Sequence, residues 1–257
     1  MVIIENGFLD EKFNNLIISN KTSNKEFFDL LYDYNKLLHK VLYNFDGIKQ
    51  NNEINYIVPA FAKLVKLFQS CVIMLEYGMP DISESMLRSI YDLKFQMLYV
   101  LKNDINYQRL IKRMFSKELG KLNYIDKHSL YDYVSKDDVE NIRKVWNFTI
   151  EQLKDISCAP DTRQMCEELG LEEEYVFYSM LCNNSHQSCD VIYSLNKDFG
   201  IDILPDFVNI YLVGFRLCNA IDLVLNKIIT KYAPHLNEEY NKLIEQCNKL
   251  FEKTKEE

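Results

Sequence analysis

Along most of the chain, apolar residues recur every three or four positions, the spacing that places side chains on one face of an α-helix. The periodicity predicts helices at about residues 23–45, 53–77, 82–103, 105–125, 135–156, 162–169, 171–196, 205–232 and 237–256, after a short amphipathic segment at 8–20. Pro59 lies early in the second of these helices, so we expect that helix to start near residue 58.

These elements predict an all-α fold, a single-domain bundle of about eight to ten helices over residues 1–257. Residues 1–22 should form a peripheral lead-in, and residues 235–257 a charged C-terminal helix with a frayed end. The 257 residues include only 7 Gly and 5 Pro, fewer than the turns of a many-stranded sandwich or barrel require. We expect the central helices to be those at about 58–77, 82–103, 171–196 and 205–232.

The formal net charge is −8, which does not resemble the broad basic surface of a protein that binds duplex DNA. One cationic stretch, Gln108–Arg113 with Lys117 and Lys121, lies on one side of a predicted helix, and we interpret it as a solvated face. The most apolar segment, residues 209–229, is interrupted by three polar residues at helical spacing. This interruption indicates a core helix and not a membrane span.

The chain has 7 cysteines, an odd number, and several of them lie in apolar helical runs. The first residues lack the basic start and the long apolar stretch of a secretory signal. Reduced, buried thiols fit this pattern best, so we expect a cytoplasmic protein.

The first candidate for chemistry is the pair Arg88 and Asp92, which are four residues apart and therefore neighbours on one helix face. Arg88 lies beside the apolar stripe of its helix. A guanidinium in such a position needs a partner, because an unpaired buried charge is costly. The pair is therefore either a structural ion pair at the edge of the core or part of a functional site.

The second candidate lies on the predicted helix at 171–196, where Tyr178, Cys182, His186 and Asp190 recur every four residues and share one face. Asn183 begins an Asn-Asn-Ser-His run of poor helix formers, which is typical of a place where function or a polar network overrides helix propensity. His186, with Asp190 placed to orient its imidazole, acts as a general acid or base, or else it is a buried histidine satisfied by hydrogen bonds.

Two other chemistries on this helix are less favoured. A zinc site would need Cys182, His186 and Cys189 to converge, yet the two cysteines are seven residues apart, about 10.5 Å along a helix axis. A Cys182–His186 nucleophilic pair has the right spacing but no evident oxyanion element. The chain also lacks a Gly-rich phosphate loop and a His-Glu-x-x-His motif, so we expect no metal and no cofactor.

Three stretches resemble a bacterial all-helical family that is described only as a domain of unknown function. They are Leu75–Gly78 with Leu87-Arg88-Ser89-Ile90-Tyr91-Asp92, then Tyr107–Arg113, and then Gly170-Leu171 with Tyr175, Tyr178, Cys182 and His186. Asp92 stands where that family usually has Glu, and Cys182 where it usually has Ser. The resemblance covers about residues 55–195 and implies an all-α fold with Arg88 and His186 in one site.

That family is in turn similar to the HEPN helical domains, many of which are metal-independent ribonucleases of phage-defence and toxin systems. HEPN ribonucleases use an Arg and a His a few residues apart on one helix. Here the nearest Arg upstream of His186 on the chain is Arg163, so Arg88 would have to serve from a neighbouring helix. The likeness implies RNA as a substrate, with Tyr178 and Asn183 positioning it.

Two functions are therefore expected. The first is a HEPN-like endoribonuclease, a phage-defence or toxin effector, with His186 as general acid/base and Arg88 as phosphate contact. The second is a non-enzymatic binding or scaffold module of a bacterial defence or regulatory complex, with Arg88, Asp92 and His186 as a structural polar network. For either function we expect a homo-oligomer that has RNA, a partner protein or an antitoxin as its partner, and no membrane.

Overall fold

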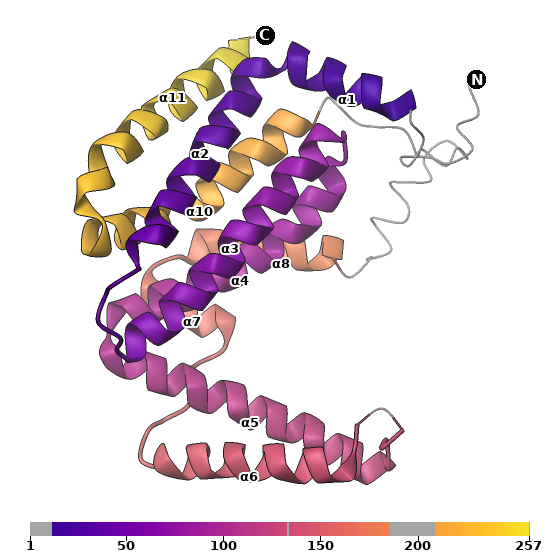
Figure 1. Ribbon diagram of the computed structural model, residues 1–257, viewed down its shortest axis with the longest axis vertical. Helices are drawn as coiled ribbons and strands as arrows, with labels where there is room; N and C mark the ends of the chain where they lie inside the picture. Colours follow the sequence, from indigo (N-terminus) through magenta and orange to yellow (C-terminus); the bar gives the residue numbers. More distant parts are fainter. Residues whose placement is uncertain (1–11, 133, 186–208, 257) are drawn as a thin grey trace. The chain divides into compact units, whose positions relative to one another are not determined.

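The computed structural model of the protein describes residues 12–132, 134–185 and 209–256, and all regular secondary structure within these ranges is helical (Figure 1). The all-α prediction is therefore confirmed. The described helices are α1 (Lys12–Ser23), α2 (Lys25–Asn44), α3 (Asn52–Glu76), α4 (Pro80–Lys102), α5 (Asp104–His128), α6 (Lys136–Gln152), α7 (Thr162–Leu169), α8 (Glu172–Ser185), α10 (Ile210–Tyr232), the 3-10 turn η2 (Pro234–Leu236) and α11 (Asn237–Glu256).

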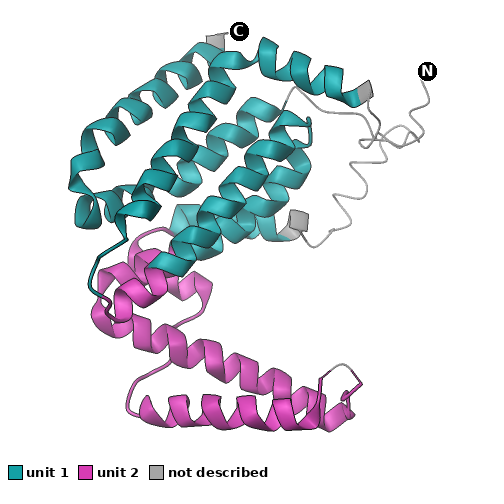
Figure 2. Ribbon diagram, in the orientation of Figure 1, with its two compact units in different colours: residues 1–49, 58–94, 172–257 teal, residues 50–57, 95–171 magenta. Residues whose placement is uncertain are grey.

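The chain divides into two compact units (Figure 2). Unit 1 comprises residues 1–49, 58–94 and 172–257, and unit 2 comprises residues 50–57 and 95–171. Both divisions of the central region fall inside helices, one in α3 and one in α4. The prediction of a single domain over residues 1–257 stays a prediction.

The core of unit 1 is formed where α2 packs against α10 and α11. The apolar face of α2 is almost completely buried, and Phe27 lies against the rings of Tyr211 and Phe215 on α10, with centroids 4.5 and 5.8 Å apart. At Gly214, a Cβ atom would overlap the Phe27 ring, so the backbone of α10 approaches that ring more closely than any larger residue allows. α10 is the core helix that the interrupted apolar segment at 209–229 predicts.

The N-terminal helix α1 is attached to the end of α3. The Asn20 amide donates hydrogen bonds to the backbone carbonyls of Leu75 (3.2 Å) and Glu76 (2.9 Å), which are the last carbonyls of α3 and have no partner within that helix. The Glu76 carboxylate in turn receives a hydrogen bond from Tyr32 at 2.5 Å and pairs with Lys21 at 3.1 Å. One end of α3 is therefore tied to both α1 and α2.

Most predicted helix limits agree with the structure to within a few residues, but the expected start of α3 near residue 58 is wrong. α3 begins at Asn52 and continues through Pro59. The Asn51 side chain accepts a hydrogen bond from the backbone N–H of Ile54 at 2.8 Å and so satisfies a donor at the true N-terminus. The turn before Pro59 also buries Ile54 and Ile57. The cap and this buried apolar surface together offset the cost of a proline inside the helix.

Other helix ends carry residues that are typical of helix caps. Ser135 caps α6 by accepting a hydrogen bond from the N–H of Asp138 at 3.1 Å. Gly170 ends α7 with a left-handed φ of 71°, and Gly78 follows α3 with a φ of 69°. By length and hydropathy, α3 is also the one described helix that would suffice to cross a membrane, a test that buried core helices pass as well.

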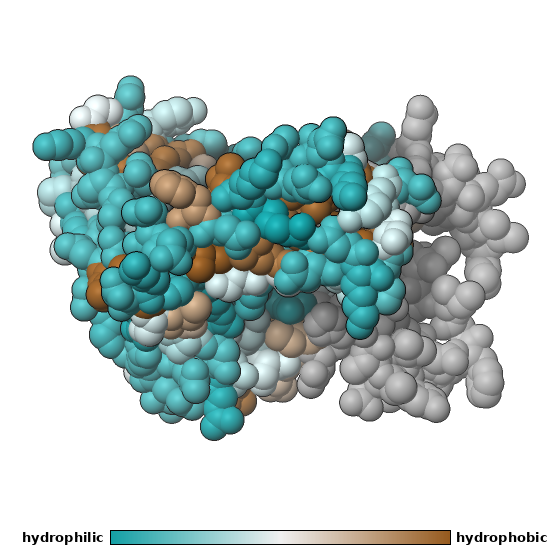
Figure 3. Space-filling model, turned by 90° about the horizontal axis from the view of Figure 1, so that it is seen from below, coloured by the Kyte–Doolittle hydropathy of each residue, from teal (hydrophilic) through white to brown (hydrophobic). Residues whose placement is uncertain are grey.

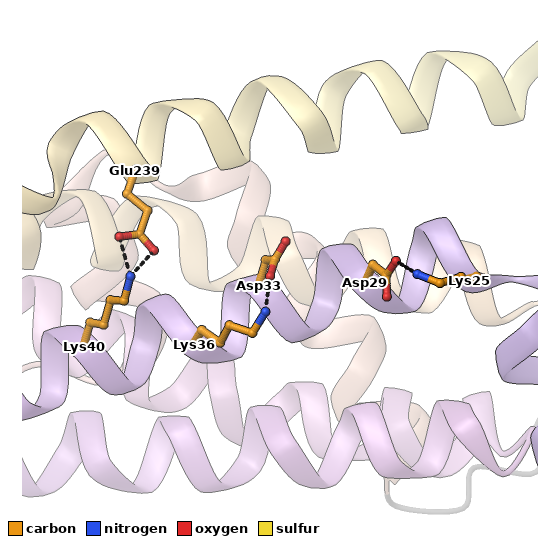
Figure 4. A network of polar contacts seen from close by, with 6 residues as sticks. All are labelled: Lys25, Asp29, Asp33, Lys36, Lys40 and Glu239. Atoms are coloured by element: carbon orange, nitrogen blue, oxygen red, sulfur yellow. Dashed lines mark hydrogen bonds and ion pairs between the residues drawn. The ribbon is translucent and has the colours of Figure 1, made fainter.

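Exposed ion pairs line the surface of α2. Lys40 reaches both carboxylate oxygens of Glu239 on α11, at 2.7 and 2.8 Å, while Lys25 and Lys36 pair with Asp29 and Asp33 on α2 itself (Figure 4). Pairs as exposed as these contribute little to stability, about 0–1 kcal/mol each. The buried apolar faces therefore supply most of what holds α2 to α11.

In unit 2, α5 and α6 pack side by side. Lys112 on α5 donates hydrogen bonds to the carbonyls of Leu153 (2.9 Å), Lys154 (3.1 Å) and Ile156 (2.7 Å), so one ammonium group satisfies three acceptors just after α6 ends. Arg109 lies 5.6 Å from the Tyr99 ring. The interpretation of residues 108–113 as a merely solvated face is therefore wrong for these two cations.

We predict that Gly214→Ala lowers the free energy of unfolding by about 1–3 kcal/mol, because the added methyl group overlaps the Phe27 ring and forces the two helices apart. Urea denaturation followed by circular dichroism measures the change. The control is Gly120→Ala on α5, where the new Cβ meets nothing within 4 Å. That change should be neutral or stabilise by up to about 1 kcal/mol, and equal losses at both sites would contradict the prediction.

Candidate functional site

Three charged residues of α4 recur at intervals of four, Glu84, Arg88 and Asp92, and so follow one another along one side of the helix. The same helix buries Leu87 and Ile90 completely, which fixes its rotation about its own axis. Because the three charges flank this apolar stripe, all three side chains are half-buried. The helix therefore presents a row of alternating charge at the edge of the unit 1 core.

Tyr178 of α8 is the centre of the contacts made by this row. Its side chain is only 8% exposed, and its hydroxyl donates a hydrogen bond to Asp92 Oδ1 at 2.8 Å. The same hydroxyl interacts with the Arg88 guanidinium and with the Cys182 thiol. Arg88, Asp92, Tyr178 and Cys182 therefore form one cluster across the contact of α4 and α8.

The cluster changes the acidity of two of its members. The hydrogen bond to Tyr178 is the main cause that raises the pKa of Arg88, and the charge of the Asp92 carboxylate adds to it, so the guanidinium stays charged at any physiological pH. Burial, followed by the hydrogen bond to the Asp92 carboxylate, raises the pKa of Tyr178 well above its usual value. The phenol therefore keeps its proton and remains the hydrogen-bond donor to Asp92.

A second cation pairs with Glu84, the residue of the same row that precedes Arg88 by one helical turn. Arg216 of α10 forms an ion pair with Glu84, and its guanidinium carbon lies 5.2 Å from the centre of the Phe177 ring. Phe177 in turn meets Tyr91 edge to face, with ring centroids 5.7 Å apart. These contacts connect α4, α8 and α10 around the same row of charges.

The ammonium group of Lys94 is buried beside this network. Lys94 is 1% exposed, pairs with Glu174 of α8, and lies 5.3 Å from the centre of the Tyr91 ring. A buried ammonium group is tolerated only with a partner, and the ring face adds a favourable cation–π contact. Because Glu174 precedes Tyr178 by one turn of α8, this ion pair also fixes the position of Tyr178 along the axis of α4.

The structure brings together four of the residues predicted for the site, namely Arg88, Asp92, Tyr178 and Cys182. His186 and Asp190 lie outside the described residues, and so does the side chain of Asn183. Within the described ranges, no group of His, Cys, Asp or Glu side chains has a geometry that could hold a metal ion.

Sequence reasoning missed Glu84, Lys94, Glu174 and Arg216 as neighbours of this cluster. The signal for Glu84 was its spacing, because it precedes Arg88 by one helical turn. Lys94 is a charge within an apolar run, a position that requires a partner. The sequence contains no signal that pairs Arg216 with Glu84, because the two are 132 positions apart.

Chemically, the cluster offers a permanent cation that is held in place by neighbouring groups. Arg88 is positioned by a phenol that is itself fixed by a carboxylate, so little side-chain freedom remains to be lost when an anion binds. A guanidinium can bind two phosphate or carboxylate oxygens at once. The arrangement is therefore suited to contact an anionic group.

Together, the fold and this cluster define an all-α protein with a charged, arginine-centred cluster between two helices. The chain belongs to the family of unknown function DUF5677, whose family profile matches residues 54–202. This match covers more than half of the chain and includes α4 and α8, on which the cluster lies. No curated protein and no solved structure shows a significant match to the chain.

We predict that Glu174→Gln lowers the free energy of unfolding by about 1–3 kcal/mol, because Lys94 then remains buried without a counter-charge. The side chain of Glu174 is 32% exposed, so solvent screening keeps the loss below that of a fully buried pair.

The matched variant is Lys94→Met, which removes the buried charge itself and should cost less than about 1 kcal/mol or stabilise. Denaturant melts of both variants show which substitution lowers the free energy of unfolding more. A larger loss for Lys94→Met would show that the ammonium group contributes more than its partner.

We predict that Tyr178→Phe lowers stability near neutral pH by about 0.5–1.5 kcal/mol, because Asp92 loses a hydrogen bond. The wild-type stability should also fall as pH rises above about 10, because Tyr178 then ionises in the unfolded chain while the folded protein retains its proton.

In Tyr178→Phe, part of this alkaline fall should be absent. Melts from pH 7 to the alkaline limit of folding measure it, and Tyr43→Phe, on a side chain that is 73% exposed, controls for the loss of a hydroxyl. An alkaline fall that is the same in wild type and Tyr178→Phe would contradict the prediction.

Proposed function

We propose that this protein is a HEPN-like, metal-independent endoribonuclease that serves as an effector in bacterial phage defence or as a toxin. The observation that supports this most is the placement of Arg88 at the hydroxyl of Tyr178 within an α4–α8 cluster. Its fixed, permanently charged guanidinium is the group that phosphodiester cleavage needs beside the phosphate. The match to DUF5677 is compatible with this activity but assigns none.

In the proposed reaction, His186 takes the proton from the 2′-hydroxyl of the ribose, whose oxygen then attacks the adjacent phosphorus. Charge develops on the phosphate oxygens, and Arg88 stabilises it. The bond from phosphorus to the 5′-oxygen breaks, and that oxygen takes up the proton that His186 accepted, which leaves a 2′,3′-cyclic phosphate and a neutral imidazole. His186 follows Cys182 by four positions in the sequence, which is the spacing that also separates Cys182 from Tyr178. Asn183 and Tyr178 would position the RNA, and Asp190 would orient the imidazole.

A second function is favoured by the internal pairing of the cluster. Tyr178 is nearly buried, and the polar groups of Asp92, Tyr178 and Arg88 already contact one another. Such a network also suits a non-enzymatic binding or scaffold module of a bacterial defence or regulatory complex, with Arg88, Asp92 and His186 holding the fold. A partner protein or an antitoxin would then be recognised elsewhere on the molecule.

We predict that expression of the wild-type chain in a bacterial cytoplasm slows growth and fragments RNA, whereas His186→Ala and Arg88→Ala abolish both effects. Loss of either group should lower the cleavage rate by at least about a hundredfold. Total RNA integrity and cleavage of a labelled single-stranded RNA in a chelating buffer are the measurements. Cleavage should persist with the chelator.

Thermal melts of the same variants separate the two functions. For the ribonuclease, activity is lost while the melting temperature of His186→Ala stays near that of the wild type. For the structural module, the wild type leaves RNA intact and His186→Ala unfolds earlier, with a loss of about 1–3 kcal/mol. Equal RNA integrity with wild type and His186→Ala rules out the proposed activity.

A further inference from the structure

Helix α6 of unit 2 carries apolar side chains on the side that faces away from α5. Val145 is 61% exposed, Phe148 is 67% exposed and Ile142 is 37% exposed. The three residues are spaced by three, so they form a slanted row along the helix. On the adjacent side of α6, Val139 is fully buried and Trp146 meets Phe115 of α5, with ring centroids 5.9 Å apart. α6 is thus apolar on two sides, of which α5 covers one.

The α5–α6 pair as a whole also buries few of its side chains. Of the 25 residues of α5, the buried ones are Asn106, Leu110 and Leu122, and α6 has Val139 alone. The rings of Trp146 and Phe115 remain half-exposed although they pack on each other. Two packed layers are the usual minimum for burying such faces, and this pair is a single layer of two helices. In the view from below, toward α6, hydrophobic surface shows between rows of hydrophilic side chains (Figure 3).

The charged residues beside the apolar row indicate which partner could cover that row. Lys144 and Glu151 are seven residues apart, two helical turns, so they lie on the same side of α6, next to Phe148. Both are exposed, and among the described residues the ion pair of Glu151 is the one with Lys154, at 3.4 Å in a solvent-exposed contact. In an antiparallel pairing of two identical α6 helices centred between them, each Lys144 meets the Glu151 of the other copy. The edge is therefore self-complementary, as a two-fold interface requires.

We propose that the exposed face of α6, with Ile142, Val145 and Phe148 at its centre, is the dimer interface of this protein with a second copy of the same chain. Two α5–α6 layers then form a four-helix arrangement in which the apolar rows cover each other. The two Lys144–Glu151 pairs at the rim select the antiparallel register, while the aromatic and aliphatic side chains supply most of the affinity. The proposal does not depend on ribonuclease activity.

Sedimentation velocity of the full chain over a concentration series tests the proposal. The wild type should approach twice its monomer mass of 30.5 kDa as its concentration rises. Phe148→Glu places a carboxylate at the centre of the interface and should raise the dimer dissociation constant at least about 30-fold. The matched control is Tyr43→Glu on α2, where the side chain is 73% exposed and lies in unit 1. This control should leave dissociation unchanged.

Charge exchange tests the register independently of core packing. K144E and E151K should each weaken the dimer about two- to fivefold, because every copy then sets like charges together. The double variant K144E/E151K restores two opposite-charge pairs and should dimerise as the wild type does. If Phe148→Glu fails to fold, as judged by circular dichroism, the charge exchange by itself tests whether α6 forms the dimer interface.

Three results would overturn the proposal. If the wild type stays monomeric at every concentration, the exposed row on α6 does not bind a second copy, and a segment of its own chain or another protein covers it. A wild-type dimer that Phe148→Glu leaves intact uses another surface. Charge variants that weaken the dimer additively, with no recovery in the double variant, exclude the antiparallel contact of α6 with its copy. RNA cleavage measured on the same proteins reports separately on the proposed function.

Discussion

The cost of burying a charged group organises the α4–α8 region. The Lys94 ammonium group is inside unit 1, and only a carboxylate held at the right height makes that position tolerable. Glu174 meets this requirement and thereby fixes α8 on α4. With the register set, Tyr178 comes opposite Asp92, and Arg88 meets the hydroxyl of Tyr178. A pair with a purely structural task thus determines the geometry of the residues that are candidates for chemistry.

The sequence was informative about elements and about individual helix faces. Helical periodicity predicted the all-α fold and the limits of most helices, since each helix buries its own stripe. The periodicity placed the start of α3 at 53, next to the observed Asn52, and only the later start near 58 drawn from Pro59 was wrong. The side chain of Asn51 caps the helix at its true start. A proline inside a helix costs about 3 kcal/mol, more than a cap of about 1 kcal/mol returns, so the burial of Ile54 and Ile57 in the first turns is also needed to keep that start.

The site could be predicted in part for a related reason. Arg88 with Asp92, and Tyr178 with Cys182, follow from spacing within one helix, and the likeness to a helical family paired the two helices. Contacts between helices far apart in the chain, such as Arg216 with Glu84, leave no periodic trace, because each residue looks like an ordinary polar position on its own helix. The sequence therefore indicated which faces carry the polar groups but not which partners those groups find.

The amide of Asn20 has a consequence for where this fold can be shortened. It occupies two carbonyls at the end of α3 that the helix itself leaves open, and its own helix is α1. A chain trimmed to begin at Asn24 would keep every apolar residue of α2, but the Glu76 carbonyl would lose the Asn20 amide, and the Leu75 carbonyl would keep the N–H of Gly78 as its donor. The Glu76 carboxylate would keep its hydrogen bond from Tyr32 and lose its ion pair with Lys21. Helix α1 thus holds the end of a helix that follows it by more than fifty residues, and the N-terminal border of a stable fragment lies before Asn20.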